Sequence, residues 1–309
     1  MNVRLCTLIT ALLLSWLNVA IAQTKLEFKF PDERQTKTLV KVTSQQMLTL
    51  NNMPMETGSE QEMVILTNNG KRAEDGTLRQ SQKIESLKAK LTMPGGVVLS
   101  FDSATPNQPL PGTKYDVFLD LIKTNANASW TVVRDKENRV ASIDGRDKVL
   151  ESLDETKREL VKRQIDGNYL RDKANQEMEK IPSKPVNKGD SWELSETMRL
   201  EGGQSMTLKT KYTYQGEVDH NGKKVHQIDV ETTQVSYSID ADAATPLKLA
   251  SSNLKPKMVE GVIFFDQESG QTIEAREKIQ ITGDLKFTVS GNELAGKLDL
   301  TIGSSSVVQ

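Results

Sequence analysis

Apolar and polar side chains alternate along the first part of the chain, downstream of a leading apolar run. Short stretches at residues 39–43 and 61–66 show this alternation, and the pairs Asn69-Gly70 and Asp75-Gly76 follow them. A further turn is indicated by Pro94-Gly95-Gly96. Because the side chains of a strand point alternately to its two faces and such pairs favour tight turns, the pattern predicts antiparallel strands joined by hairpins.

The same alternation returns in the last third of the chain. Residues 241–256 interrupt it and are predicted to form a long surface loop. Turns are predicted at Asn221-Gly222, Ser269-Gly270, Gly283-Asp284 and Gly291-Asn292. The predicted strands cover residues 206–214, 224–235, 259–266, 272–281, 285–289 and 294–302.

Between these regions the apolar spacing changes from two residues to three and four. A short helix is predicted by the positions of Tyr115, Phe118, Leu119 and Ile122. Residues 146–180 contain no proline and carry an apolar stripe at helical spacing. Asp166-Gly167 is expected to break this segment into two helices. The charges of the segment are balanced, so we expect the stripe to pack on a sheet.

The order of strands, helices and strands predicts an α+β fold. In this prediction two antiparallel-sheet regions, with curved or half-barrel sheets, flank a central helical segment. Leu99-Ser100-Phe101-Asp102 is similar to Ile263-Phe264-Phe265-Asp266, which suggests an internal duplication. The predicted organisation is a signal peptide at 1–22, a strand-rich half with a short helix at 23–145, a helical segment at 146–181 and a second strand-rich half at 182–309.

The leading segment has the features of a cleavable export signal. Arg4 precedes an apolar run at residues 5–17, which is shorter than the roughly 20 residues that a membrane-spanning helix needs. Small residues end the segment, so cleavage is predicted between Ala22 and Gln23. The protein is therefore expected to be exported, either periplasmic or secreted, with no transmembrane segment after cleavage.

The single cysteine, Cys6, lies in the segment that is predicted to be removed. The exported part would then have no disulfides, no thiolate chemistry and no cysteine-bound metal. The charges are balanced, because 40 basic residues are interspersed among 42 acidic ones. A net charge near zero gives no reason to expect nucleic acid as a partner.

Candidate chemistry is sparse. Only His220 and His226 are histidines, and Asp219 would be needed to complete a metal site with them. A hairpin turn explains these residues without a metal, so we predict no metal, no cofactor and no catalytic residues. The sequence has neither a Gly-x-Ser-x-Gly element nor a glycine-rich phosphate loop. Paired carboxylates of a hydrolase remain an alternative, since the chain is rich in acids.

Two motifs resemble a known family. Residues 261–271 and the entry Lys188-Gly189-Asp190-Ser191-Trp192, together with the export signal, are similar to a family of exported bacterial proteins of unknown function. That resemblance implies a compartment and a β-rich fold but no activity. At the level of the fold the chain also resembles periplasmic carriers of lipoproteins and lipids, in which a curved antiparallel sheet wraps around helices and leaves an apolar cavity.

These observations favour an exported, non-enzymatic binding protein of the cell envelope that carries an apolar ligand or a lipid. A scaffold that binds an envelope protein through sheet edges or through residues 241–256 is the first alternative, and the hydrolase is the second. The side chains expected around the cavity are Phe118, Leu119, Ile122, Tyr212, Tyr214, Phe264 and Phe265.

Overall fold

The computed structural model describes residues 23–105, 111–126, 128–200, 203–241, 243, 245 and 247–309. The predicted signal peptide at 1–22, and Ala22 of its cleavage site, therefore lie outside the described residues. Among the described helices, none combines the length and the apolar composition that crossing a bilayer requires.

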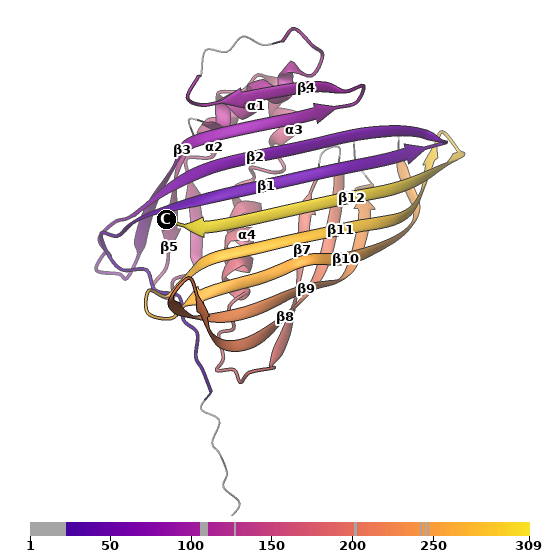
Figure 1. Cartoon of the computed structure of the whole chain (residues 1–309). Helices are drawn as coiled ribbons and strands as arrows, with labels where there is room; N and C mark the ends of the chain where they lie inside the picture. Colours follow the sequence, from indigo (N-terminus) through magenta and orange to yellow (C-terminus); the bar gives the residue numbers. More distant parts are fainter. Residues whose placement is uncertain are drawn as a thin grey trace, which may run out of the picture.

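The strands of the described residues form one antiparallel sheet of twelve strands (Figure 1). Its strands follow one another in the order β6-β5-β3-β2-β1-β12-β11-β10-β9-β8-β7, and β4 pairs with β3 beside β5. The strands are β1 (Gln35–Leu50), β2 (Met53–Asn69), β3 (Leu78–Met93), β4 (Val97–Asp102), β5 (Ser129–Arg134), β6 (Val140–Asp144), β7 (Ser191–Arg199), β8 (Gln204–His220), β9 (Lys223–Ile239), β10 (Lys248–Asp266), β11 (Gln271–Val289) and β12 (Asn292–Val308).

The prediction of an α+β fold with two sheet regions is wrong. The first and last long strands, β1 and β12, pair over thirteen registered residues from Thr38 opposite Val308 to Leu50 opposite Gly296. This pairing joins both strand-rich halves into one sheet, so the helices do not separate two sheets. Alternation along a strand indicates which face each side chain takes, but it does not indicate which distant strand lies alongside.

Within the described residues, four helices accompany the sheet: α1 (Asp116–Ala126), α2 (Asp147–Glu151), α3 (Glu155–Val161) and α4 (Gly167–Glu179). The predicted short helix and the predicted break at Asp166-Gly167 are confirmed, although the first of the two expected helices is itself divided. The side chains of Asp154 and Asp166 accept hydrogen bonds from the first turns of α3 and α4. These caps fix where both helices begin.

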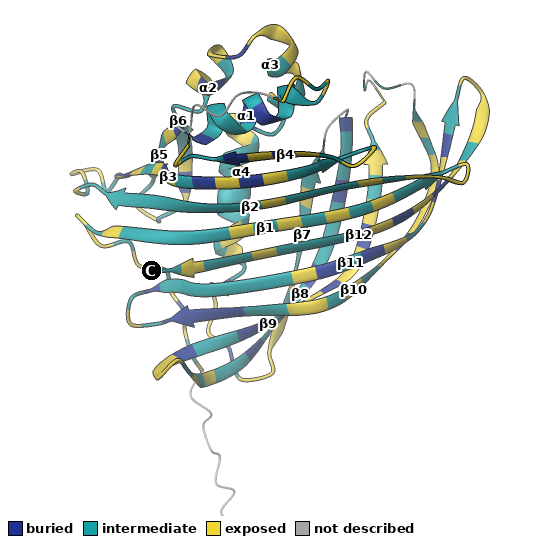
Figure 2. Ribbon diagram, turned by 45° about the horizontal axis from the view of Figure 1, so that its top comes forward, coloured by how far each residue is buried: buried dark blue, intermediate teal, exposed yellow. Residues whose placement is uncertain are grey.

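Helix α4 lies inside the curve of the sheet and contacts both of its end strands (Figures 1 and 2). On the β6 side, Asn175 Oδ1 accepts a hydrogen bond from Val140 N at 2.8 Å, and Asn175 Nδ2 donates to Val140 O at 3.0 Å. On the β7 side, Arg199 N donates to Tyr169 Oη at 3.3 Å. Because edge strands expose unpaired backbone groups, α4 protects both edges with polar side chains.

We expect Asn175→Ala to destabilise the protein by about 1–2 kcal/mol, because it leaves the Val140 N–H and C=O without their partners. The measurement is the free energy of urea unfolding. Asn168→Ala is the matched control, since Asn168 lies on the same helix and bonds only to the side chain of Arg171 among the described residues. Equal effects of the two substitutions would contradict the assigned role of Asn175.

The main apolar cluster lies on one face of strands β7–β12 and β1. In β11, Ile281, Leu285 and Phe287 are almost completely buried, and the ring of Tyr237 in β9 meets Phe287 edge to face at 6.5 Å. Strands β9 and β11 are therefore in contact across the curve, where this end of the sheet packs on its own side chains. Figure 2 shows the alternation of buried and exposed residues clearly along β3.

Three further predictions need correction. Gly283-Asp284 is not a turn, because β11 runs through it, and the predicted loop at 241–256 ends at Lys248, where β10 begins. The two segments compared as a duplication do not occupy equivalent places. Residues 99–102 lie in the short strand β4, whereas residues 263–266 lie in β10 between β9 and β11.

Candidate functional site

An extended N-terminal segment, residues 24–34, crosses one end of the curved sheet, and we call it the strap. Thr24 pairs with Val186 in an isolated bridge, and Lys29 N donates to Gly270 O at 2.9 Å. Lys29 Nζ also donates to the carbonyls of Gln267 and Glu268, at 2.9 and 3.2 Å. The strap is thus bonded both to the segment after α4 and to the turn between β10 and β11.

Alternate residues of the strap point inward. Leu26 is buried, and the ring of Phe28 meets Phe265 edge to face at 5.4 Å. Phe30 lies beneath the guanidinium of Arg134, which is 4.1 Å from its ring centre. Arg134 also donates to Met178 Sδ at 3.0 Å, and its burial lowers its pKa to about 10.

A cavity of about 820 Å³ lies where the strap, the end of α4 and the start of β7 meet. Its polar lining includes Lys25, Arg139, Glu179 and Lys184, and acids and bases are mixed around it. The apolar part of the lining consists of Leu26, Phe28, Met178, Ile181, Pro182, Val186, Trp192 and Leu194. Segments far apart in sequence therefore supply one continuous apolar wall.

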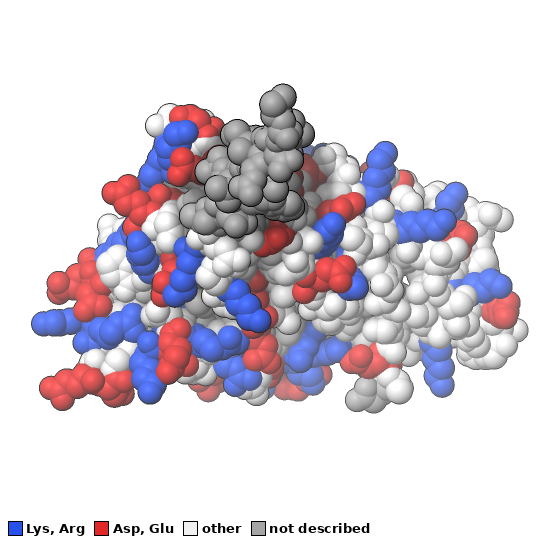
Figure 3. All heavy atoms as spheres, turned by 90° about the horizontal axis from the view of Figure 1, so that it is seen from below, with Lys and Arg blue, Asp and Glu red and all other residues white. Residues whose placement is uncertain are grey.

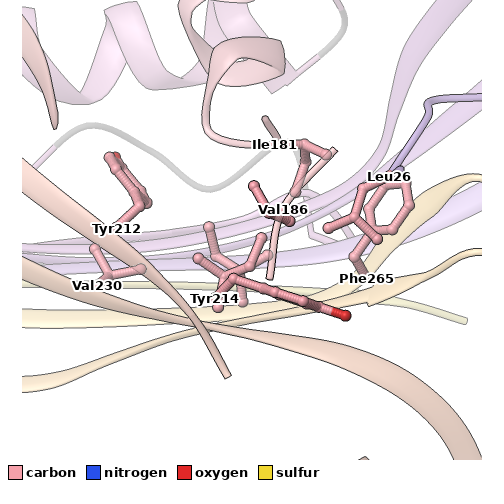
Figure 4. Close-up of a cluster of buried hydrophobic side chains, with 9 residues drawn as sticks. Leu26, Ile181, Val186, Tyr212, Tyr214, Val230 and Phe265 are labelled. Carbon is pink, nitrogen blue, oxygen red and sulfur yellow. The ribbon is translucent and has the colours of Figure 1, made fainter. Parts of the chain in front are cut away.

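The wall rests on a tightly packed cluster beneath the strap (Figure 4). Figure 4 shows Ile181 and Val186 on the segment after α4, with Leu26 and Phe265 beside them. Trp192 packs against this cluster and stacks on Tyr212 with ring centres 5.9 Å apart. A buried cluster of this kind holds the inner wall in one conformation.

A smaller, more polar pocket of about 160 Å³ shares Glu179 and Leu194 with this cavity. Lys180 reaches Glu177 at 3.1 Å and Glu277 at 3.2 Å. Burial alone would lower the pKa of Lys180, but the two carboxylates outweigh it and raise that pKa above its usual value. The ion pairs of Lys180 therefore connect the end of α4 to strand β11 beside this pocket.

The side chains that the sequence predicts around one cavity lie apart in the structure. Leu119 and Ile122 pack in a cluster with β3 and β4. Tyr212, Tyr214 and Phe265 belong to the cluster beneath the strap, and Tyr212 also lines the smaller pocket.

The remaining two predicted side chains are also separate. Phe264 stacks on His220, with ring centres 3.9 Å apart, and Phe118 is a half-buried residue of α1. The seven do not surround a common space. The strap residues were missed as site residues, although Leu26, Phe28 and Phe30 alternate with charged residues and so carry the pattern of an inward-facing segment.

The two histidines do not share a site. His220 Nε2 lies 2.8 Å from Glu274 Oε2, whereas His226 Nδ1 lies 2.8 Å from Tyr214 Oη. Burial lowers the pKa of His226. Within the described residues, no group of three or more His, Cys, Asp or Glu side chains is placed to hold a metal.

Charges of both signs are mixed on the surface. Figure 3 shows Lys and Arg interspersed with Asp and Glu on the face seen from below, without a large area of one sign. Cross-strand pairs contribute to this mixture, such as Lys41 with Glu62 at 2.8 Å and Lys209 with Glu193 at 2.9 Å. Exposed pairs of this kind add little stability because solvent screens them.

Comparison with known proteins gives a family but no activity. The profile of a family of unknown function matches residues 75–270, which confirms the predicted resemblance to such a family. A search of curated protein sequences found no match.

Solved structures resemble the chain only distantly. Lipovitellin, in a structure titled for its lipid–protein interactions, is 14% identical over 91% of this chain, with a TM-score of 0.47. This chain covers a quarter of that lipovitellin chain. An outer-membrane channel from Pseudomonas putida is 9% identical, covering 92% and 98% of the two chains, with a TM-score of 0.22.

Proposed function

The chain belongs to DUF6263, a family of unknown function, and we propose that it is a non-enzymatic binding protein for an apolar or amphiphilic small molecule. The 820 Å³ cavity under the strap carries this proposal. Its volume lies within the roughly 300–1,000 Å³ of small-molecule sites. Because residues 1–22 predict export, the proposed binding of a small molecule would take place in the cell envelope.

The construction of the wall supports an apolar ligand. Leu26, Ile181 and Val186 are each less than 10% exposed and lie in one packed cluster, while Trp192 and Leu194 beside them are only partly buried. An apolar surface that stays partly exposed gains about 25 cal/mol for each Å² that a ligand covers. The polar residues of the lining would then contact the polar end of an amphiphile.

The first test is native mass spectrometry of the purified full chain, followed by solvent extraction and lipid analysis. We expect a bound small molecule or acyl chain that is released on denaturation. A titration with a dansyl-labelled fatty acid complements it, because Trp192 in the wall is a nearby energy donor. If nothing is retained and the labelled fatty acid does not bind, the proposed function is wrong.

Leu194→Gln is expected to weaken binding of the labelled fatty acid by about tenfold, since it replaces an apolar wall contact with an amide that must be desolvated. The measurement is the dissociation constant from energy transfer. Leu208→Gln is the matched control, because Leu208 is also partly buried but belongs to the cluster away from the cavity. Equal weakening by both substitutions would indicate a general effect on folding and would contradict the assigned wall.

A further inference from the structure

A second pocket, of about 750 Å³, lies at the other end of α4. It is formed where β6 leads into α2, where α3 leads into α4 and where β7 ends. Four basic side chains line it, namely Arg146, Lys162, Arg163 and Arg199. The cavity under the strap contacts the last residues of α4, so the two pockets lie at opposite ends of this helix.

Arg146 is the unusual member of this group. Its guanidinium lies over the ring of Trp130 at 4.6 Å, and within the part of the chain that the structure describes it has neither an ion pair nor a hydrogen bond. Burial lowers the pKa of Arg146, and no carboxylate offsets that effect. The side chain as a whole is half-buried, but its Nη1 is buried without a partner among the described residues, and such a donor is costly unless an anion binds to it.

Arg163 and Arg199 also keep unused donors. Arg163 Nη2 pairs with Asp240 at 2.5 Å, but its Nη1 is buried without a partner among the described residues. Arg199 Nη1 donates to the backbone oxygen of Arg163 at 3.3 Å and lies 3.7 Å from Asp166, while its guanidinium stacks on Tyr169 at 4.5 Å. Stacking holds a guanidinium in place while leaving its in-plane donors available.

Two of the three acids of this lining have partners. Asp144 pairs with Arg79 at 2.9 Å, and Asp166 accepts the hydrogen bond that caps α4. Asp147, the third acid, is exposed, and Lys162 is paired with Glu159. Among the described residues, Arg146 and Asp147 are thus the charged side chains of the lining without an ion pair, and of these two only Arg146 has a buried donor without a partner.

We infer that this pocket binds a phosphate group, with Arg146 as its principal contact and Arg163 and Arg199 as supporting contacts. Guanidinium donors match the oxygens of phosphate in pairs, and several of them favour a dianion. The pocket is large enough for a phosphate ester. Either a soluble phosphomonoester or the head group of an anionic lipid would provide this chemistry. The inference does not depend on the proposed function of the cavity.

The test is a calorimetric titration of the full chain with glycerol 3-phosphate. Trp130 fluorescence provides a second readout, because its ring lies under Arg146. We expect Arg146→Gln to weaken binding at least about tenfold, since it removes a charge-assisted contact. Arg146→Lys should restore part of the affinity. Arg171→Gln is the matched control, because Arg171 lies on α4, bonds to Asp172 and does not line the pocket.

The source of the phosphate is tested separately. Flotation with phosphatidylcholine vesicles that contain 20% phosphatidic acid is compared with flotation using phosphatidylcholine alone. Binding to the first vesicles without binding of glycerol 3-phosphate would identify a lipid head group, and the converse would identify a soluble ester. The inference is overturned if neither binds, if glycerate binds as tightly as glycerol 3-phosphate, or if folded Arg146→Gln binds like the unmodified chain.

Discussion

Replacing Gly283 by alanine is expected to destabilise the protein by about 3 kcal/mol, the largest effect that we predict for a single methyl group. Gly283 pairs with Leu254 in the middle of the β10–β11 ladder. A Cβ atom at this position would lie 1.9 Å from the backbone oxygen of Asn253, and its φ of +154° is one that other residues rarely adopt. The obstacle is backbone, so the two strands would have to separate.

The measurement is the free energy of urea unfolding of the full chain. Gly167→Ala is the matched control, because nothing lies within 4 Å of a Cβ at that first residue of α4. At position 167 alanine lowers the conformational entropy of the unfolded chain, so it should stabilise the folded protein by roughly 0.4–1 kcal/mol. A loss of less than about 1 kcal/mol for Gly283→Ala would show that the ladder adapts, contrary to the contact described.

Gly283 also illustrates why the sequence predicts strands better than it predicts the sheet. A Gly-Asp pair between two alternating stretches has the composition of a turn, and we predicted one there. The actual reason for this glycine is the close approach of the β10 backbone, where Leu254 lies opposite Gly283. Local composition cannot distinguish a glycine that turns the chain from one that admits another backbone.

The prediction succeeded where the determinants are local. The alternation along β8 and β9, the helical spacing from Tyr115 to Ile122 and the break at Asp166-Gly167 depend on neighbouring residues only. The pairing of β1 with β12 joins the two ends of the chain and leaves no local pattern. Consequently the number of sheets was predicted wrongly even though most of the strands were found.

The candidate sites depend on long-range placement in the same way. Aromatic residues were the natural candidates for a cavity, but Phe264 and Tyr214 serve in packing. The wall is made by Leu26 of the strap and Leu194 of β7, which no sequence pattern brings together. Arg146 is one of nine basic residues between 146 and 180, and only the structure shows that its Nη1 is buried without a hydrogen-bond partner among the described residues.

The turn between β10 and β11 holds the strap, and the strap forms part of the cavity wall. Asp266 is only 2% exposed, and its carboxylate accepts hydrogen bonds from Lys223 Nζ at 2.7 Å and from Ser269 N at 3.1 Å. Lys29 of the strap bonds to the backbone of the same turn. The carboxylate therefore orders the segment that holds the strap against the sheet.

Asp266→Asn is expected to cost about 2 kcal/mol at neutral pH, with a defined pH dependence. Burial alone would raise the pKa of Asp266, but the bonds from Lys223 and Ser269 outweigh it and lower that pKa from 3.8 to about 2. Because the pKa is lower in the folded than in the unfolded state, the ionised carboxylate stabilises the folded state at every pH above the unfolded-state pKa. This contribution is lost progressively as the pH falls from about 4 through 2, and below that pH the carboxyl is neutral in both states.

Urea unfolding of Asp266→Asn and of the unmodified chain should therefore differ by about 2 kcal/mol at pH 7 and converge as the pH approaches 2. Asp284→Asn is the matched control, because Asp284 is exposed and has no ion pair or side-chain hydrogen bond within the described ranges. Its difference from the unmodified chain should stay small at every pH. A difference for Asp266→Asn that does not change with pH would assign the loss to packing of the amide. In that case the ion pair with Lys223 would not be what holds the strap's turn in place.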